Sequence, residues 1–203
     1  MKKSLIVYAV LIFSMGAGFA DPVAVFEVQW GKGKERQSRS FAIGFFDASA
    51  PQTAANFKKL VKGGYYVKTT FHRVFPNYLV QGGDPLSKRK DRTIIGTGGP
   101  GYTLRAEIRR KHSRGAVAMG RLPDNINPTR QSNGSQFYVC LQPISSQDGQ
   151  DTIFGEVISG IEALDEISRL PADGNANPVD RIQVRKTYII DRSELGHPVK
   201  IRS

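Results

Sequence analysis

Several residue types that carry chemistry are scarce in this chain of 203 residues. There is one cysteine and there are only three histidines. A single cysteine excludes an internal disulfide, and the scattered histidines and cysteine have no spacing that fits a metal site. No serine lies in a nucleophile-elbow pattern, which removes the commonest hydrolase motif. The glycine-rich segment 96–101 lacks the lysine of a phosphate-binding loop, so we interpret it as a hairpin turn.

The chain also has no apolar run long enough for a comfortable membrane span. The apolar run at 5–13 follows Lys2 and Lys3, and small residues after it end at Ala20. This order is typical of a secretory signal, so we predict that residues 1–20 are removed on export and that the protein works in the periplasm. A retained membrane anchor is the alternative interpretation.

Basic residues outnumber acidic ones by 29 to 18. Loss of residues 1–20 removes two lysines and no acidic residue, so the formal charge falls from +11 to +9. This charge favours anionic partners, and after export we expect weak contact with an anionic membrane surface rather than nucleic acid. The alternative is that the charge only keeps the protein soluble. We expect a monomer.

Glycine and proline, in contrast, are plentiful, with 21 and 11 residues. They favour many short strands joined by turns over a helical bundle. Apolar patterns predict helices over 50–61 and 161–170. They predict strands over 23–28, 41–46, 70–74, 78–81, 115–119, 135–141, 152–158 and 182–190. We therefore predict one mainly β domain over 21–203, a closed antiparallel eight-stranded β-barrel capped by two α-helices, with a short basic C-terminal tail.

Three segments carry the candidate chemistry. They are FHRVFPNYLVQGGD at 71–84, GAVAMGR at 115–121 and NGSQFYV at 133–139. In this order and spacing they resemble the cyclophilin family of peptidyl-prolyl cis-trans isomerases, and the likeness extends over about 23–190. The resemblance implies an isomerase that acts on proline-containing polypeptides without a cofactor. Cys140 lies in the apolar run 137–141, where we predict a buried strand thiol rather than a nucleophile.

The chemistry explains why such residues belong together. Rotation about an X–Pro bond crosses a barrier of about 18–20 kcal/mol, because twisting the amide breaks its resonance. A cationic donor near the twisted amide favours the transition state, in which the nitrogen lone pair becomes available. The resemblance implies that Arg73 is this catalytic donor, and that Gln81 binds the substrate backbone and helps to place Arg73. Considered alone, Arg73 would be interpreted as a surface salt-bridge residue.

The resemblance also assigns residues to substrate binding. It implies an apolar pocket for the proline ring, and it places the main chain at two further positions along an extended peptide. We interpret His72 as a structural or substrate-side histidine, because the reaction transfers no proton. The predicted substrate-binding residues are His72, Tyr78, Leu79, Met119, Gly120, Arg121, Gln136 and Tyr138.

Several positions depart from the family pattern. Tyr78 and Tyr138 stand where many relatives have phenylalanine, which adds hydroxyl groups at the pocket rim. Arg121 replaces a common asparagine and brings a second cation near the groove, and Asp151 replaces a histidine or tyrosine. The loop 145–149 lacks the aromatic residue of many relatives, so we expect impaired cyclosporin binding.

These departures leave two hypotheses. In the first, the protein is an enzyme that isomerises X–Pro bonds in exported proteins, a step slow enough to limit folding. In the second, the same groove only binds proline-containing segments, as a chaperone or scaffold would. Acceleration of isomerisation that depends on Arg73 distinguishes the enzyme from the binding module.

Overall fold

The computed structural model describes residues 20–196. The predicted signal lies outside these residues except for Ala20, and the end of the predicted tail, 197–203, also lies outside them. Within the described part, helices α1 (Pro51–Lys62) and α2 (Ile161–Ser168) accompany eleven strands. The strands are β1 (Pro22–Trp30), β2 (Gln37–Phe45), β3 (Thr70–Phe71), β4 (Arg73–Phe75), β5 (Leu79–Gly82), β6 (Thr103–Leu104), β7 (Ala116–Met119), β8 (Ser132–Asn133), β9 (Phe137–Cys140), β10 (Ile153–Ser159) and β11 (Ile182–Asp191).

Nine of these strands form one antiparallel sheet in the order β3-β11-β1-β2-β10-β7-β9-β5-β4. Its end strands, β3 and β4, are separated in sequence by His72 alone and form no ladder with each other in the described chain. The predicted mainly β domain with two helices is confirmed, whereas the predicted closure of eight strands into a barrel is not, because the ladder has nine strands and two ends. One continuous segment bends at His72 and pairs with β11 before the bend and with β5 after it, so the chain itself connects the two ends of the ladder.

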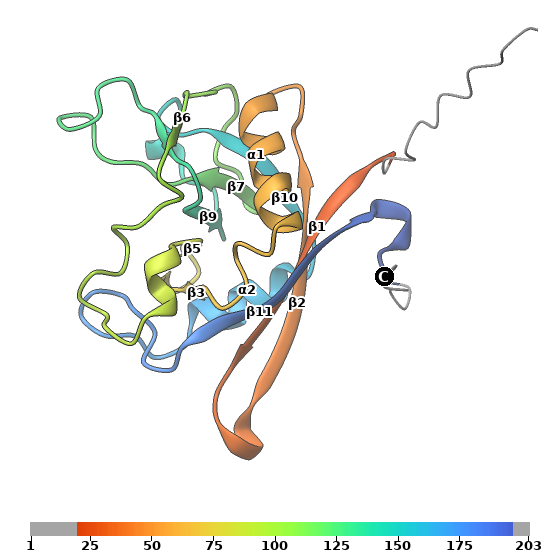
Figure 1. Ribbon diagram of the computed structural model, residues 1–203, viewed down its shortest axis with the longest axis vertical. Coiled ribbons are helices and arrows are strands. Elements are labelled where there is room, and N and C mark those ends of the chain that lie inside the picture. The colour runs from red at the N-terminus through yellow and green to blue at the C-terminus, as the bar shows by residue number, and fades with distance from the viewer. Residues whose placement is uncertain (1–19, 197–203) are drawn as a thin grey trace, which may run out of the picture.

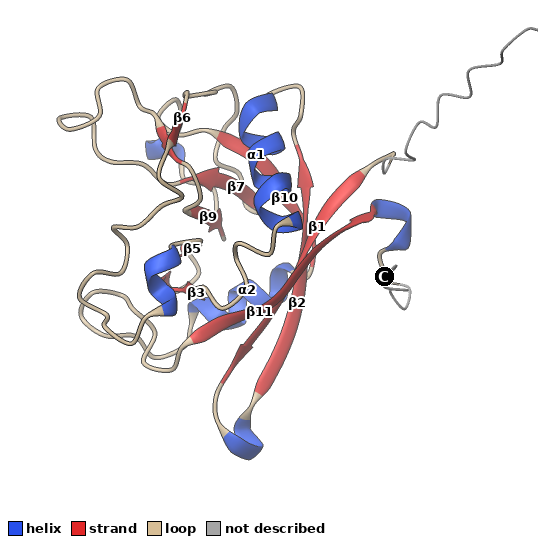
Figure 2. Ribbon diagram, in the orientation of Figure 1, coloured by secondary structure: helices blue, strands red, loops and turns tan. Residues whose placement is uncertain are grey.

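The three long strands β1, β2 and β11 run side by side, and the β1–β2 hairpin extends beyond the body of the molecule (Figure 1). Side chains that alternate along β1 serve both faces of the sheet. Phe26 and Val28 belong to the main core, whereas Val23 and Val25 pack in a smaller cluster with Ile190. Both helices lie against this sheet (Figure 2).

Helix α1 places Phe57 at the centre of the main core. The Phe57 ring lies 4.7 Å from that of Phe154 and 5.2 Å from that of Phe137, measured between ring centres. The apolar residues Phe57, Leu60 and Val61 are buried and form the inward face of the helix. Phe137 extends this packing to β9, the strand whose other face carries part of the candidate site.

Two local predictions need correction. Segment 96–101 is not a hairpin turn, because β6, which follows it, pairs with the remote strand β8 rather than with a neighbour in sequence. Gly98 instead lies so close to the buried Asp84 that a Cβ at this position would overlap the Asp84 carboxylate. The predicted strand 70–74 is interrupted at His72, where the chain changes partners. No helix within residues 20–196 has the length and apolarity that crossing a membrane requires.

Candidate active site

The candidate site lies on the outer face of neighbouring strands β4, β5 and β9. In β5, Val80 packs in the main core, and Leu79 and Gln81 on either side of it point to the opposite face. The register places Arg73 of β4 and Tyr138 of β9 beside Gln81. Because successive side chains of a strand alternate, Arg73, Gln81 and Tyr138 form a row across one face of the sheet.

A groove of about 550 Å³ lies over this face. Beneath it is a second apolar cluster, separate from the main core. The cluster consists of Ala116, Ala118, Tyr138, Cys140, Ile144 and Ile153, with Phe46, Tyr78 and Leu79 packed against it. Cys140 is buried there as predicted, and burial raises the pKa of its thiol to about 12, so the group stays protonated. An apolar floor beside a few polar groups is the usual design of a small-ligand pocket.

Arg73 is the cation with free donors in this groove. Its side chain is exposed, and it forms no hydrogen bond or ion pair with any residue between 20 and 196. The guanidinium carbon lies 4.9 Å from the centre of the Phe75 ring, which supports the side chain from one side. Arg73 and Gln81 also line a second hollow of about 480 Å³, so they separate two depressions of the surface.

Gln81 is held by a neighbouring amide. The Gln81 Nε2 atom donates to Gln136 Oε1 at 3.1 Å, and Gln136 Nε2 donates to the carbonyls of Gly96 at 2.9 Å and Gly98 at 2.8 Å. These two carbonyls fix the orientation of the Gln136 amide, because only an N–H group can face them. Gln81 therefore presents its own Oε1 oxygen as an acceptor. Gln136 is itself buried, and its hydrogen bond with Gln81 connects it to the groove.

The other predicted binding residues occupy different places. His72 is 5% exposed and lines the second hollow, and its ring nitrogens have no hydrogen-bond partner among residues 20–196. Burial lowers the pKa of His72, which favours the neutral ring. Met119 is wholly buried in the main core, because strand alternation turns it away from the groove that Tyr138 faces. Gly120 lines the groove, but its N–H donates to Gln136 O and its carbonyl accepts from Asn133 N.

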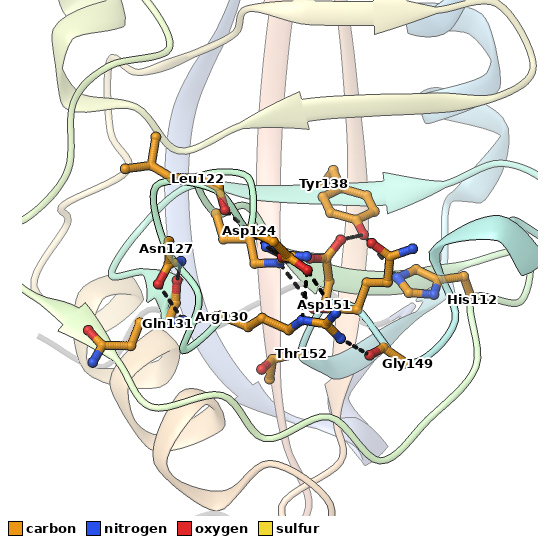
Figure 3. Close-up of polar contacts among 12 residues, drawn as sticks. His112, Leu122, Asp124, Asn127, Arg130, Gln131, Tyr138, Gly149, Asp151 and Thr152 are labelled. Atoms are coloured by element: carbon orange, nitrogen blue, oxygen red, sulfur yellow. Dashed lines mark hydrogen bonds and ion pairs between the residues drawn. The ribbon is translucent and has the colours of Figure 1, made fainter.

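Arg121 lines the groove together with Asp124 and Asp151, and Figure 3 shows these two carboxylates and their polar contacts. Its Nε donates to Asp151 Oδ1 at 2.7 Å, its Nη1 contacts Asp124, and its side chain is 8% exposed. The Tyr138 hydroxyl donates to the other Asp151 oxygen at 2.8 Å. The second cation expected near the groove is therefore neutralised by two carboxylates. The main-chain groups of Arg121 make no hydrogen bond within the described residues and remain open to a peptide.

Sequence reasoning missed part of this wall. Leu122, Pro123 and Asp124 line the groove, as do Gln147 and Gln150. Asp124 is held between two arginines, and hydrogen bonds from Arg130 and Arg121 lower the pKa of its carboxyl group. The separation of three residues between Arg121 and Asp124 was the sequence feature from which their ion pair could have been predicted. Among the described residues, no group of three histidine, cysteine, aspartate or glutamate side chains is arranged to hold a metal ion.

Comparisons with known proteins support the family resemblance that the sequence motifs indicated. The family model described as "Cyclophilin type peptidyl-prolyl cis-trans isomerase/CLD" matches residues 33–189. The "Peptidyl-prolyl cis-trans isomerase-like 1" of Aspergillus oryzae is 35% identical over 161 residues, which cover 76% of this chain and 92% of that protein. A "Peptidyl-prolyl cis-trans isomerase" of Helicobacter pylori is 35% identical over 135 residues, covering 64% of this chain and 75% of that protein.

Solved structures show the same likeness. A crystal structure of a cyclophilin-type peptidyl-prolyl cis-trans isomerase of Cryptosporidium parvum is 26% identical, with a TM-score of 0.68 over 84% of this chain and 98% of that one. A second structure of that protein, in the presence of the dipeptide Ala-Pro, is 27% identical, with a TM-score of 0.66 over 81% and 99%. Fold, groove and matches together define a peptidyl-prolyl cis-trans isomerase. Within that class, the chain belongs to the cyclophilin-type family.

Proposed function

We propose that the mature chain 21–203 isomerises X–Pro bonds in exported proteins in the periplasm, and that Arg73 is its catalytic donor. The observation that carries the catalytic assignment is the row of Arg73, Gln81 and Tyr138 over an apolar floor, with the Arg73 donors free. The order of basic, apolar and small residues over 1–20 supports export.

The groove accounts for catalysis without a nucleophile. A proline ring that packs on Leu79 and Tyr138 is held while the carbonyl before it rotates. Rotation frees the lone pair of the proline nitrogen, and a donor aimed at that atom stabilises the twisted state more than either planar state. The Arg73 guanidinium supplies several N–H donors from one planar cationic group. Gln81 Oε1 is placed to accept from a substrate N–H.

The two hollows on either side of Arg73 suit a peptide longer than the X–Pro unit. The groove with Tyr138 would hold the proline, and the hollow lined by His72 would hold the chain beside it. Asp173 and Asn175 give the second hollow polar walls, which suit a peptide backbone more than an apolar side chain.

The catalytic proposal is tested with the purified 21–203 chain and a short X–Pro peptide, by NMR exchange between the cis and trans forms. Arg73→Ala is expected to lower kcat/KM by about 10²-fold, the scale of losing one preorganised donor. Arg39→Ala, which removes an arginine that pairs with Glu166 on another face, serves as the matched control. An Arg73→Ala chain with full kcat/KM would contradict the assignment.

Export is tested separately. The full chain is expressed in a Gram-negative host, and the soluble periplasmic protein is analysed by intact mass. We expect the mass of residues 21–203 in the periplasmic fraction. A full-length mass that stays with cytoplasm or membranes would contradict the proposed cleavage after Ala20, whatever the isomerase activity.

A further inference from the structure

A wholly buried carboxylate follows Gln81 in the chain by three residues. Asp84 is 0% exposed, and among residues 20–196 its side chain accepts only from main-chain N–H groups. The Asp84 Oδ1 atom accepts from Leu86 N at 2.7 Å, and the Oδ2 atom accepts from Gly96 N. Because burial of a carboxylate is costly unless its oxygens are hydrogen-bonded, these two amides determine where Asp84 lies.

Gly96 connects this carboxylate to the groove. Its N–H donates to Asp84, and its carbonyl accepts from Gln136 Nε2 at 2.9 Å. Gln136 Oε1 accepts in turn from Gln81 Nε2 at 3.1 Å. These contacts form a ring through Asp84, Gly96, Gln136 and Gln81, which the short chain segment between Gln81 and Asp84 closes. Because the ring is closed, a shift of Gly96 is transmitted to the Gln81 amide.

Gly98 lies in the same loop but is held in a second way. It packs closely against Asp84, and its carbonyl accepts from Gln136 Nε2 at 2.8 Å. Asn133 Nδ2 also donates to that carbonyl, at 3.0 Å, so Gly98 keeps a partner when Asp84 is replaced. The Gly96 N–H has no acceptor other than Asp84 among the described residues. Gly96 is therefore the link through which Asp84 reaches Gln136.

We propose that Asp84 is a positioning residue of the isomerase: by holding Gly96 it fixes the Gln136 amide, which sets the orientation in which Gln81 meets the substrate. The inference rests on the proposed use of the groove by an X–Pro peptide. Asp84 itself lines neither the groove nor the second hollow. Any effect of Asp84 on catalysis must therefore pass through the ring.

The two oxygens of Asp84 face two different N–H groups, which decides how other side chains would behave there. An asparagine has one side-chain oxygen, so its NH₂ group would face the N–H of either Leu86 or Gly96. Asp84 is the cap of the 3-10 turn Pro85–Lys88, and serine caps a helical turn as aspartate does. Asp84→Ser is therefore expected to keep the cap on Leu86 and to lose the contact with Gly96.

The test measures kcat/KM on an X–Pro peptide by NMR exchange, at a temperature where circular dichroism shows each variant to be folded. Asp84→Ser is expected to lower kcat/KM by about fivefold, the factor for the one neutral hydrogen bond that orients Gln81. Glu107→Gln is the matched control, because the Glu107 carboxylate also accepts from two main-chain N–H groups, at the start of α1. It should keep the wild-type value. A wild-type kcat/KM in Asp84→Ser would overturn the inference.

A second pair of variants reaches the ring without changing Asp84, and it decides the question if Asp84→Ser does not fold. Gly96 and Gly101 have φ angles of +95° and +90°, and a Cβ at either position would have no other atom closer than 4.0 Å. An alanine is strained at such angles, so both substitutions disturb the main chain in the same way. Gly96→Ala is expected to lose about fivefold in kcat/KM. Gly101→Ala, outside the ring, should keep the wild-type value, and equal values for the two would count against the ring.

Combination with Gln136→Ala separates positioning from general damage. If Asp84 and Gly96 act through Gln136, adding Gln136→Ala to Asp84→Ser or to Gly96→Ala causes no further loss, and each double variant stays about fivefold below the wild type. Independent effects would multiply to about 25-fold. A multiplied loss would show that Asp84 only supports the fold, and would overturn the inference.

The two proposals fail in different ways. An active wild type with an unaffected Asp84→Ser contradicts the role of Asp84 alone. A folded wild type without isomerase activity contradicts the proposed function, and the side-chain amide signals of Gln81 and Gln136 then test the ring. These signals are expected to move in Asp84→Ser and to stay in place in Glu107→Gln. Signals that stay in place in both variants would overturn the inference in that case too.

Discussion

At the scale of single residues, Gln136 decides how Gln81 is presented to a substrate. Replacing it by alanine removes the acceptor of the Gln81 amide and the donor to the Gly96 carbonyl, while the Gly98 carbonyl keeps its hydrogen bond from Asn133 Nδ2. We expect Gln136→Ala to lower kcat/KM by about fivefold, the effect of one neutral hydrogen bond on the reaction barrier. Gln29→Ala, on the β1–β2 hairpin away from the groove, is the control. Equal kcat/KM for the two variants would show that Gln81 is held by other means.

Short motifs predict residues of this site only as far as strand geometry agrees with them. Arg73, Gln81 and Tyr138 were predicted together, and the ladders place them side by side. Met119 was predicted to line the pocket from the same kind of motif, but it lies on the core side of β7. The partners of Arg121 include Asp151, which lies 30 residues away. A single sequence gives no signal for such a remote pair.

At the scale of elements, α1 begins at an N-terminus whose cap comes from a distant loop. Ala50 has no side chain that can cap, and Glu107 does so instead. Its carboxylate accepts from Gln52 N at 3.1 Å, and from the Thr53 N–H at 2.9 Å and hydroxyl at 2.8 Å. A negative charge at this end of a helix also interacts favourably with the positive end of the helix dipole.

Glu107→Gln keeps the size of this cap and removes its charge. We expect it to lower the free energy of unfolding by about 1 kcal/mol, the usual value of a capping interaction. The measurement is chemical denaturation of the 21–203 chain at neutral pH. Glu35→Gln, at the exposed tip of the β1–β2 hairpin, should leave the midpoint unchanged. If both variants unfolded at the wild-type midpoint, the capping role would be wrong.

The sequence predicted the existence of elements better than their pairing. Pro51 and Gly63 marked the ends of α1, because proline suits a first helical turn and glycine a helix end. Pairing depends on contacts between remote segments. The two-residue strands β6 and β8 exist only because Thr103 and Leu104 meet Asn133 and Ser132 across a long loop. Their short runs have no periodicity from which a strand could be predicted.

At the scale of the whole molecule, β1 and β11 bring the two ends of the domain together. Their ladder begins at the pair Pro22 and Asp191. The Asp191 carboxylate accepts from the Asp21 N atom at 3.1 Å, and Arg192 Nε lies 2.7 Å from Asp21 Oδ2. In the proposed mature chain the Asp21 nitrogen becomes an α-ammonium group at the same place. The contact with Asp191 then becomes a charge-assisted hydrogen bond, which is stronger than one from a neutral amide.

Asp191 also makes the contact between the two ends of the domain sensitive to acid. The Ser193 hydroxyl, followed by the Asp21 and Ser193 amides, lowers the pKa of its carboxyl group from 3.8 to about 2. A lowered pKa in the folded state means that Asp191 stabilises the fold above about pH 4, and that this contribution disappears as pH falls toward about 2.

Thermal unfolding of the 21–203 chain between about pH 2 and about pH 7 tests this linkage. We expect Asp191→Asn to lower Tm near neutral pH, because an amide no longer carries the charge that its donors stabilise, and to approach the wild-type Tm at the acid end. Asp180→Asn is the matched control, since the Asp180 carboxylate has one exposed partner, Lys32, at 3.8 Å. Wild-type and Asp191→Asn curves that run parallel over the whole range would show that acid acts through other carboxylates.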